Sequence, residues 1–234
     1  MGLAVDLMDS RTLLNIFQVA IVILIPLGVY LAVTIGRRRD LQRHYALVSL
    51  AETLGLPYTS EDQTILPVFG GFPFPPTGNA ARAYSVMRGT MAGAPMVLFD
   101  YDVTIGTPNN RDILRRTVAA FDVTATPLPV FFLESGYQEK FTRVLDKVFG
   151  AEAGIEFPED AEFALRYRVV GADVDAVRGV LGPAVRSLLK QRDWKCRSTG
   201  RWLLLSWLRD RPTPAEDRAF IEAASEARSL MLAR

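Results

Sequence analysis

The stretch LLNIFQVAIVILIPLGVYLAVTI, residues 13–35, contains 23 consecutive residues without a charged side chain. At about 1.5 Å of rise per residue, a helix of this length measures roughly 35 Å, slightly more than the roughly 30 Å hydrocarbon core of a bilayer. Gly36 follows, and the next three residues are all arginine. Length, composition and basic flank together predict a transmembrane helix over residues 13–36.

Two other interpretations of this stretch are a cleaved secretory signal and a buried core helix. A signal peptide has a positively charged start and a shorter apolar stretch of about 7–15 residues. Here the residues before the apolar run include Asp6 and Asp9 against a single basic residue, Arg11. The arginines after the run are typical of a stop-transfer signal. The sequence therefore favours a retained helix.

Basic residues are unequally distributed around this helix, and the difference predicts its orientation. Residues 1–12 contain one basic residue, whereas the other flank begins with three arginines and continues with Arg43. The positive-inside rule then places residues 1–12 outside the cytoplasm and residues 37–234 inside it. The single cysteine, Cys196, allows no disulfide within the chain, which suits a reducing compartment. We therefore expect a single-pass plasma-membrane protein.

Charge is almost balanced over the chain but not along it. The net formal charge of +1 gives no reason to expect a nucleic-acid partner. Residues 134–175 contain ten acidic and five basic residues, whereas residues 178–211 contain nine basic and two acidic residues. The basic residues either contact an anionic lipid surface or pair with the acidic stretch. The predicted membrane-surface set is Arg37, Arg38, Arg39, Arg43, Lys190, Arg192, Lys195 and Arg197.

The hydrophobic pattern after residue 36 alternates between helical and strand periods. Helical spacing covers residues 40–54, 137–148, 174–181, 184–190 and 214–232. Strand alternation covers residues 82–88, 96–104, 116–125, 128–133, 163–169 and a hairpin over 194–207. The order contains no repeated strand–helix–strand unit, so the predicted fold class is α+β, with a mostly antiparallel sheet and packed helices behind the single N-terminal transmembrane helix. Residues 37–234 then form one domain or two related lobes, about 37–133 and 134–234.

Several short motifs lie in this part of the chain: FDY at residues 99–101, TV at 117–118, LPVFFLE at 128–134 and GAD at 171–173, four residues after Tyr167. In these motifs the chain resembles a family of uncharacterised bacterial membrane-anchored proteins with one N-terminal span and a soluble domain of unknown function. Ser135 and Asp102 depart from the family pattern, which often has proline and an aromatic residue there. The resemblance covers most of residues 45–225. It implies the bacterial inner membrane and supplies no activity.

Asp100 and Asp102 are the residues in which an enzymatic site is most plausible. They lie on one face of the predicted strand over residues 96–104, opposite Phe99 and Tyr101. Side chains two apart on a strand are about 6–7 Å from each other, a distance that suits an acid–base pair or a metal ion. The simpler interpretation is a solvated strand face, because no histidine or further carboxylate cluster accompanies them. We expect no metal and no cofactor.

Other conspicuous side chains have structural interpretations. His44 is expected to be solvated or to face lipid headgroups. Cys196 is expected to be a small buried hydrophobic residue, and the tryptophans at 194, 202 and 207 to be core residues. The phenylalanines of the irregular loop 57–79 are expected to pack on the sheet. The predicted function is a membrane-tethered cytoplasmic interaction domain that binds a protein or the anionic membrane surface; the alternative is a hydrolytic or metal-assisted enzyme using Asp100 and Asp102.

Overall fold

The computed structural model describes residues 10–69, 81–91, 93–107, 110–135, 154–207, 212–213 and 215–233. The chain divides into two compact units, Met1–Ala46 and Leu47–Arg234. The described part of the first unit belongs to one helix, α1 (Ser10–Leu54), which includes Pro26 and continues into the second unit. No break occurs at Gly36, so the predicted apolar helix and the predicted helix over residues 40–54 are one element.

The apolar part of α1 is exposed. It contains a window with a mean hydropathy of 2.0, none of which is buried, and by length and composition it could cross a membrane. Its exposed large apolar side chains are Ile21, Val22, Ile23, Leu24, Ile25, Leu27, Val29, Tyr30, Leu31, Val33 and Ile35. This exposure gives no support to the interpretation of the stretch as a buried core helix.

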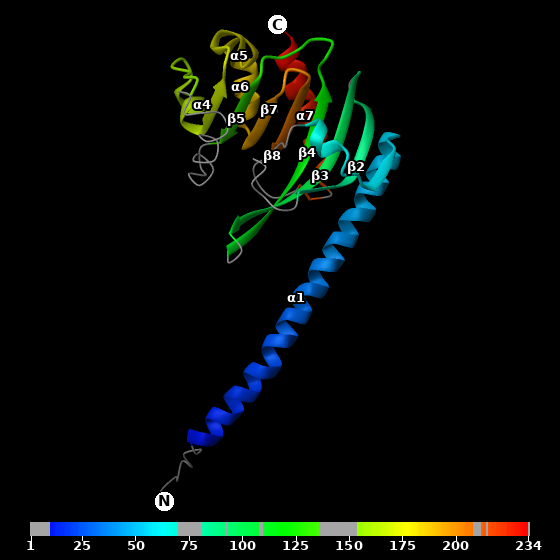
Figure 1. The fold of residues 1–234 in the computed structure, drawn as a ribbon, viewed down its shortest axis with the longest axis vertical. Helices are drawn as coiled ribbons and strands as arrows, with labels where there is room; N and C mark the ends of the chain where they lie inside the picture. The colour runs from blue at the N-terminus through cyan, green and yellow to red at the C-terminus, as the bar shows by residue number, and fades with distance from the viewer. Residues whose placement is uncertain are drawn as a thin grey trace, which may run out of the picture. The chain divides into compact units, whose positions relative to one another are not determined.

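The second unit is built on one antiparallel sheet. Its described strands are β1 (Tyr58–Glu61), β2 (Ala81–Met91), β3 (Ala94–Thr107), β4 (Asn110–Asp122), β5 (Phe131–Ser135), β6 (Tyr167–Gly171), β7 (Trp194–Ser198) and β8 (Trp202–Trp207). They are ordered β1-β2-β3-β4-β8-β7-β5-β6, and every neighbouring pair is antiparallel. The predicted antiparallel sheet is confirmed. Strands from both parts of the chain proposed as lobes belong to this one sheet (Figure 1).

Helices and apolar side chains occupy both faces of the sheet, in two core clusters. The described helices after α1 are α2 (Ile65–Val68), α4 (Ala161–Arg166), α5 (Val174–Val180), α6 (Pro183–Lys190) and α7 (Asp217–Leu232). Figure 1 shows α4, α5 and α6 grouped near β5 and β7, while α7 contacts β4 and β8. The larger cluster joins these helices and the end of α1 to the sheet through residues such as Leu47, Leu133, Leu189 and Phe220.

The smaller cluster lies on the other side of the strands and includes Phe99, Tyr101 and Val118. Phe69, which follows α2, stacks on Phe99 with 5.5 Å between ring centroids. Packing of the loop aromatics on the sheet is thus confirmed for Phe69, whereas Phe72 and Phe74 lie outside the described residues. The alternation of residues 97–103 placed this face of β3 correctly, because side chains on a strand point to opposite faces in turn.

One predicted strand is partly a helix. Residues 163–169 were expected to alternate, but Phe163 and Leu165 belong to α4, and only Tyr167 and Val169 belong to β6. The carboxylate of Asp160 accepts a hydrogen bond from the backbone N–H of Phe163, which caps α4 at its N-terminus. Leu165 is consequently turned into solvent, with 88% of its surface exposed. The predicted helix over residues 137–148 lies outside the described residues.

The last helix and the last hairpin follow their local signals in part. Glu216 accepts hydrogen bonds from both the backbone N–H and the hydroxyl of Thr213, at 3.0 and 2.8 Å. The Thr213 hydroxyl therefore donates to Glu216 and does not cap a backbone N–H of α7, whose N-cap residue is Glu216. The helix α7 itself begins at Asp217, three residues after the expected start. Gly200 has a φ of 88°, a left-handed conformation that glycine adopts readily, and it lies in the connection between β7 and β8.

Candidate functional site

Lys195 was expected at the membrane surface, but the structure buries it in the sheet. Only 1% of its surface is exposed, and its ammonium Nζ lies 2.9 Å from Oε1 of Glu134 on the neighbouring strand β5. The ammonium also lies 5.1 Å from the ring centroid of Phe132. Burial lowers the pKa of Lys195, and the Glu134 carboxylate opposes that shift. Lys195 therefore cannot meet a lipid surface in this fold.

Other basic residues of the 178–211 stretch pair with the acidic stretch before it. Lys190 Nζ lies 3.0 Å from Oδ1 of Asp160, and Arg186 Nη1 lies 2.6 Å from Oε1 of Glu159. The hydrogen bond from Lys190 lowers the pKa of Asp160 and raises that of Lys190. For Lys190 and Arg186 the structure thus supports pairing with the acidic stretch, the second of the two interpretations drawn from the sequence.

The remaining predicted surface residues fall into two groups. Arg43 is buried, and Arg197 is partly buried, so that desolvation lowers the pKa of Arg197. The exposed group consists of Arg37, Arg38, Arg39 and Arg192. Of the eight residues, these four are the ones whose guanidinium groups lie in solvent.

The carboxylates predicted as an enzymatic site are bound to neighbouring strands. Asp100 is 1% exposed and accepts a hydrogen bond of 2.6 Å from the hydroxyl of Thr117 on β4. The solvated strand face expected there is wrong for Asp100, because this face of β3 also carries buried apolar residues of the larger core cluster. Asp102 accepts a 2.5 Å hydrogen bond from the hydroxyl of Tyr84 and lies 3.6 Å from Arg115 Nε. Within the described residues no cluster of three or more metal-binding side chains occurs.

Cys196 is fully buried, as expected for a small hydrophobic residue. Its burial strongly raises the pKa of the thiol, so the reactive thiolate form is disfavoured. Trp194 and Trp207 are also buried, which confirms their interpretation as core residues. These residues belong to the sheet and offer no nucleophile.

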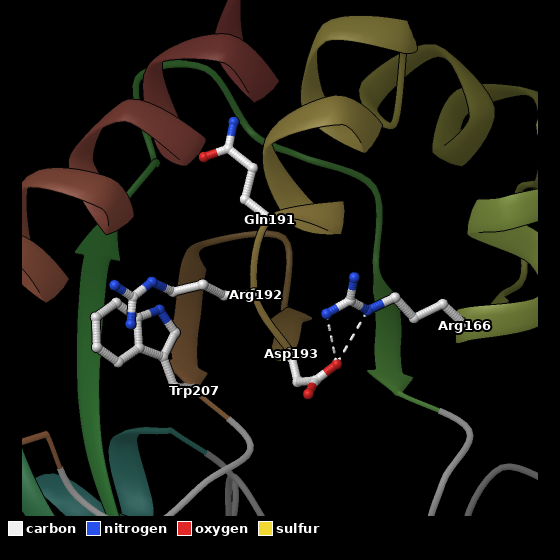
Figure 2. Close-up of a pocket in the computed structure, with 5 residues that line it drawn as sticks. All are labelled: Arg166, Gln191, Arg192, Asp193 and Trp207. Carbon is white, nitrogen blue, oxygen red and sulfur yellow. Dashed lines mark hydrogen bonds and ion pairs between the residues drawn. The ribbon is translucent and has the colours of Figure 1, made fainter.

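A pocket of about 320 Å³ lies where α4, the α6–β7 connection and the end of β8 meet. Figure 2 shows its lining: Arg166 at the end of α4, Gln191, Arg192 and Asp193 in the connection, and Trp207 at the end of β8. Arg166 donates to Oδ1 of Asp193 from Nε and Nη2, at 3.0 and 2.8 Å, and from Nη1 to the backbone carbonyl of Lys190. Arg166 therefore holds the connection in place.

Tyr167, the first residue of β6, also contacts the backbone of the α6–β7 connection. Its hydroxyl lies 2.7 Å from the carbonyl oxygen of Leu189 and 2.6 Å from that of Arg192, and it accepts a hydrogen bond of 3.1 Å from the backbone N–H of Trp194. Burial raises the pKa of Tyr167 to about 12, so the hydroxyl stays protonated at neutral pH. The backbone of the pocket is thus rigidly bonded.

Arg192 and Trp207 form the open side of the pocket. The guanidinium carbon of Arg192 lies 4.2 Å from the centroid of the Trp207 ring, within the range of cation–π contacts. Figure 2 shows the Arg192 side chain extended over the indole. Trp207 itself packs edge-on against Phe220 of α7, at 5.1 Å between centroids. The buried ring therefore lies beneath an exposed cation.

Sequence reasoning found only part of this pocket. Arg192 was selected for its charge and Trp207 for its core position, but Arg166 and Asp193 were not selected. Their pairing joins residues 27 apart in the sequence, with β6, α5 and α6 between them, and no local pattern reports such a contact. The polar run 191–193 between an amphipathic helix and a strand is the one local signal that marks a connection able to line a pocket.

The chain so described is an α+β protein with one long apolar N-terminal helix. No protein-family model and no curated protein sequence matches it. Among solved structures, it is similar to the crystal structure of the mycobacterial trehalose monomycolate transport factor A, TtfA, at 15% sequence identity and a TM-score of 0.49, over 80% of this chain and 91% of that chain. At this level of similarity, the functional assignment rests on the chain's own residues.

Proposed function

We propose that the chain is a single-pass membrane protein in which residues 13–36 cross the bilayer and residues 37–234 carry a cytoplasmic interaction domain. The observation that supports this proposal is the exposure of the apolar side chains over residues 21–35. Apolar surface in water costs roughly 25 cal/mol per Å², so a water-soluble chain would bury it. A bilayer removes that cost, and a helix satisfies its own backbone hydrogen bonds there.

The proposed orientation rests on the arginines at residues 37–39, which are exposed on α1 directly after the apolar part. Basic residues beside a span remain preferentially on the cytoplasmic side, which places residues 1–12 outside. There each exposed arginine would gain roughly 1 kcal/mol from an anionic lipid surface. In a bacterium, as the resemblance in the motifs implies, this membrane would be the inner membrane.

The partner of the cytoplasmic domain is a protein or the anionic membrane surface itself, and we propose a non-enzymatic role. The lipid-facing set is reduced to Arg37, Arg38, Arg39 and Arg192, since Lys190 and Lys195 have carboxylate partners. The enzymatic alternative gains no support from geometry, because Asp100 and Asp102 bond to neighbouring strands.

Thiol labelling in spheroplasts tests the topology. Leu165→Cys places a thiol at a residue that is 88% exposed, and Asp9→Cys places one before the helix. A membrane-impermeant maleimide should label Asp9→Cys at once and Leu165→Cys only after lysis. The natural Cys196 is buried and serves as an unreactive internal control in both variants. Labelling of Leu165→Cys before lysis would refute the cytoplasmic placement.

The arginine triplet provides a second test of orientation. Replacing Arg37, Arg38 and Arg39 by Gln should remove the charge bias and produce a mixture of both orientations. The control replaces Arg178, Arg201 and Arg218 by Gln, which removes three arginines of the sheet unit and should keep one orientation. An unchanged orientation of the first variant would show that the triplet does not determine topology.

A further inference from the structure

The pocket of Figure 2 contains one pair of charges that is already neutralised. Asp193 Oδ1 accepts two hydrogen bonds from Arg166, so this ion pair contributes no net charge to the pocket. The carbonyl groups at the end of α6 are also occupied, since Leu189 O accepts from Tyr167 and Lys190 O from Arg166. The negative end of the helix is thus covered by hydrogen-bond donors.

Three donors of the same pocket remain unused. Among the described residues, neither the Arg192 guanidinium nor the Gln191 side-chain amide forms a hydrogen bond, and both side chains are exposed. The indole Nε1 of Trp207 is buried and has no hydrogen-bond acceptor in the part of the chain that the structure describes. A buried N–H without an acceptor costs free energy, and such a group in a native protein calls for a water or a ligand.

The charge of Arg192 is not matched by a carboxylate within the pocket. Outside the pocket, Arg192 interacts electrostatically with Glu216, whose pKa is lowered mainly by its hydrogen bonds to Thr213 and to a smaller extent by Arg192. Glu216 uses Oε2 for the two hydrogen bonds that it accepts from Thr213, just before α7. Among the described residues, Arg192 contacts the Trp207 ring and has a weaker charge interaction with Glu216.

We propose that this pocket binds a phosphate ester, with Arg192, Gln191 and Trp207 Nε1 as its donors. The donors come from two elements, the α6–β7 connection and the end of β8, and a tetrahedral anion offers them several acceptor oxygens. The volume of about 320 Å³ is at the lower end of the range for small-ligand sites, about 300–1,000 Å³. In the proposed complex the exposed Arg192 side chain turns from the indole to the phosphate, which uncovers Nε1 and leaves the ring face for the organic part.

The ester could belong to a soluble metabolite or to a lipid headgroup, and two probes distinguish these sources. The full chain in a nonionic detergent is titrated with glycerol 3-phosphate and, separately, with dihexanoyl phosphatidylglycerol. Calorimetry gives the affinity, and tryptophan fluorescence reports the displacement of Arg192 from Trp207. Saturable binding of either probe supports the site, and the probe that binds identifies the source of the phosphate.

Variants at exposed positions test which residues carry the binding. Arg192→Gln should weaken the affinity about tenfold or more, since it removes a charge-assisted hydrogen bond, and Gln191→Ala about fivefold. Arg201→Gln is the matched control: Arg201 also lies over a tryptophan of the same hairpin, at 5.5 Å from the Trp202 centroid, but it contacts Asp122 at 3.5 Å. Its affinity should equal that of the wild type.

Two results would overturn the proposal. One is the absence of saturable binding of both probes at millimolar concentration. The other is an equal loss of affinity in Arg192→Gln and Arg201→Gln, which would indicate diffuse attraction to positive charge. Neither result bears on the membrane anchor, because the thiol-labelling experiment does not involve the pocket.

Discussion

The two ends of α1 have the same backbone conformation and opposite surroundings. In the apolar stretch over residues 13–35, called here the outer part of α1, Val22 is 70% exposed and Leu24 is 62% exposed. Near the end of the helix, Leu47 and Ala51 are 2% and 1% exposed. Helical hydrogen bonds are satisfied within the helix in both parts, so the backbone favours neither environment. The comparison shows that side chains decide whether a helical segment needs a protein core or another apolar medium.

This difference separates two measurable properties of the chain. Partition into the membrane should depend on the outer part of α1, and resistance to unfolding should depend on the unit Leu47–Arg234 with its sheet and two core clusters. Substitutions confined to one part should therefore change one property and leave the other unaltered.

The largest effect is expected from placing arginine in each part of α1. Leu47→Arg puts an unpaired charge in the larger core cluster and should cost about 5 kcal/mol in the free energy of unfolding. Leu24→Arg puts the same charge in the proposed span and should disfavour insertion by about 2.5–3.5 kcal/mol. Urea unfolding followed by circular dichroism measures the first, and carbonate extraction of membranes measures the second.

The separation of the two properties would be contradicted if Leu24→Arg lowered the urea midpoint as much as Leu47→Arg. It would also be contradicted if Leu47→Arg released the protein from membranes while the sheet remained folded. Leu24→Ile is the matched control for the outer part, because it keeps the hydrophobicity and the volume. It should leave both measurements unchanged.

The next effect concerns the buried pair within the sheet. Lys195→Met leaves the Glu134 carboxylate buried without its ammonium partner and should cost about 3–5 kcal/mol of unfolding free energy. The double variant Lys195→Met with Glu134→Leu should recover at least half of that loss, since apolar residues of similar volume replace such pairs well. Membrane partition should not change in either variant. If the single variant were as stable as the wild type, the pair would not be needed.

A smaller effect concerns Tyr167 beneath the pocket and depends on pH. Tyr167→Phe removes the hydrogen bonds to the carbonyls of Leu189 and Arg192 and should cost about 1–3 kcal/mol near pH 8. The folded pKa of Tyr167, about 12, exceeds the unfolded value of about 10, so its stabilisation is complete below pH 10 and is lost as the pH rises toward 12. The urea midpoint should therefore decrease more between pH 8 and pH 11 in the wild type than in Tyr167→Phe. Equal falls in the two proteins would contradict this assignment.

The smallest effect is expected at Asp160, which caps α4 and pairs with Lys190. Asp160→Asn keeps a capping side chain but loses the ion pair, so the cost at neutral pH should stay below about 1 kcal/mol. The folded pKa of Asp160 is lowered, so its stabilisation is present above the unfolded value of about 4 and is lost as the pH falls below it. The wild type should lose more stability between pH 5 and pH 2 than the variant; parallel curves would show that the pair is not stabilising.

Local patterns predicted the elements that local physics controls. The apolar run predicted a helix over residues 13–36, which α1 contains, and the alternation at Phe99 and Tyr101 predicted one face of β3. Each of these features depends on residues close in sequence, through helical or strand periodicity.

Long-range pairing explains what the patterns missed. Lys195 was expected at the surface because it is charged. Its strand, β7, lies between β5 and β8 in the sheet, and Glu134, 61 residues away in the sequence, occupies the facing position on β5. Asp100 was expected on a solvated strand face, but the packing of the sheet places that face of β3 against the larger core cluster. Periodicity states that a strand has two faces; it does not state which of them is covered.

The sequence by itself determined that the chain has one long apolar helix, an α+β unit after it and an antiparallel hairpin near its end, because these depend on the order of polar and apolar residues along the backbone. Only the tertiary structure decided which charged groups are buried, which are paired and which, like Arg192, are exposed. The physical reason is that burial and ion pairing depend on neighbours brought together across strands and helices, and the free energy of a charge is set by those neighbours and not by its own position in the sequence.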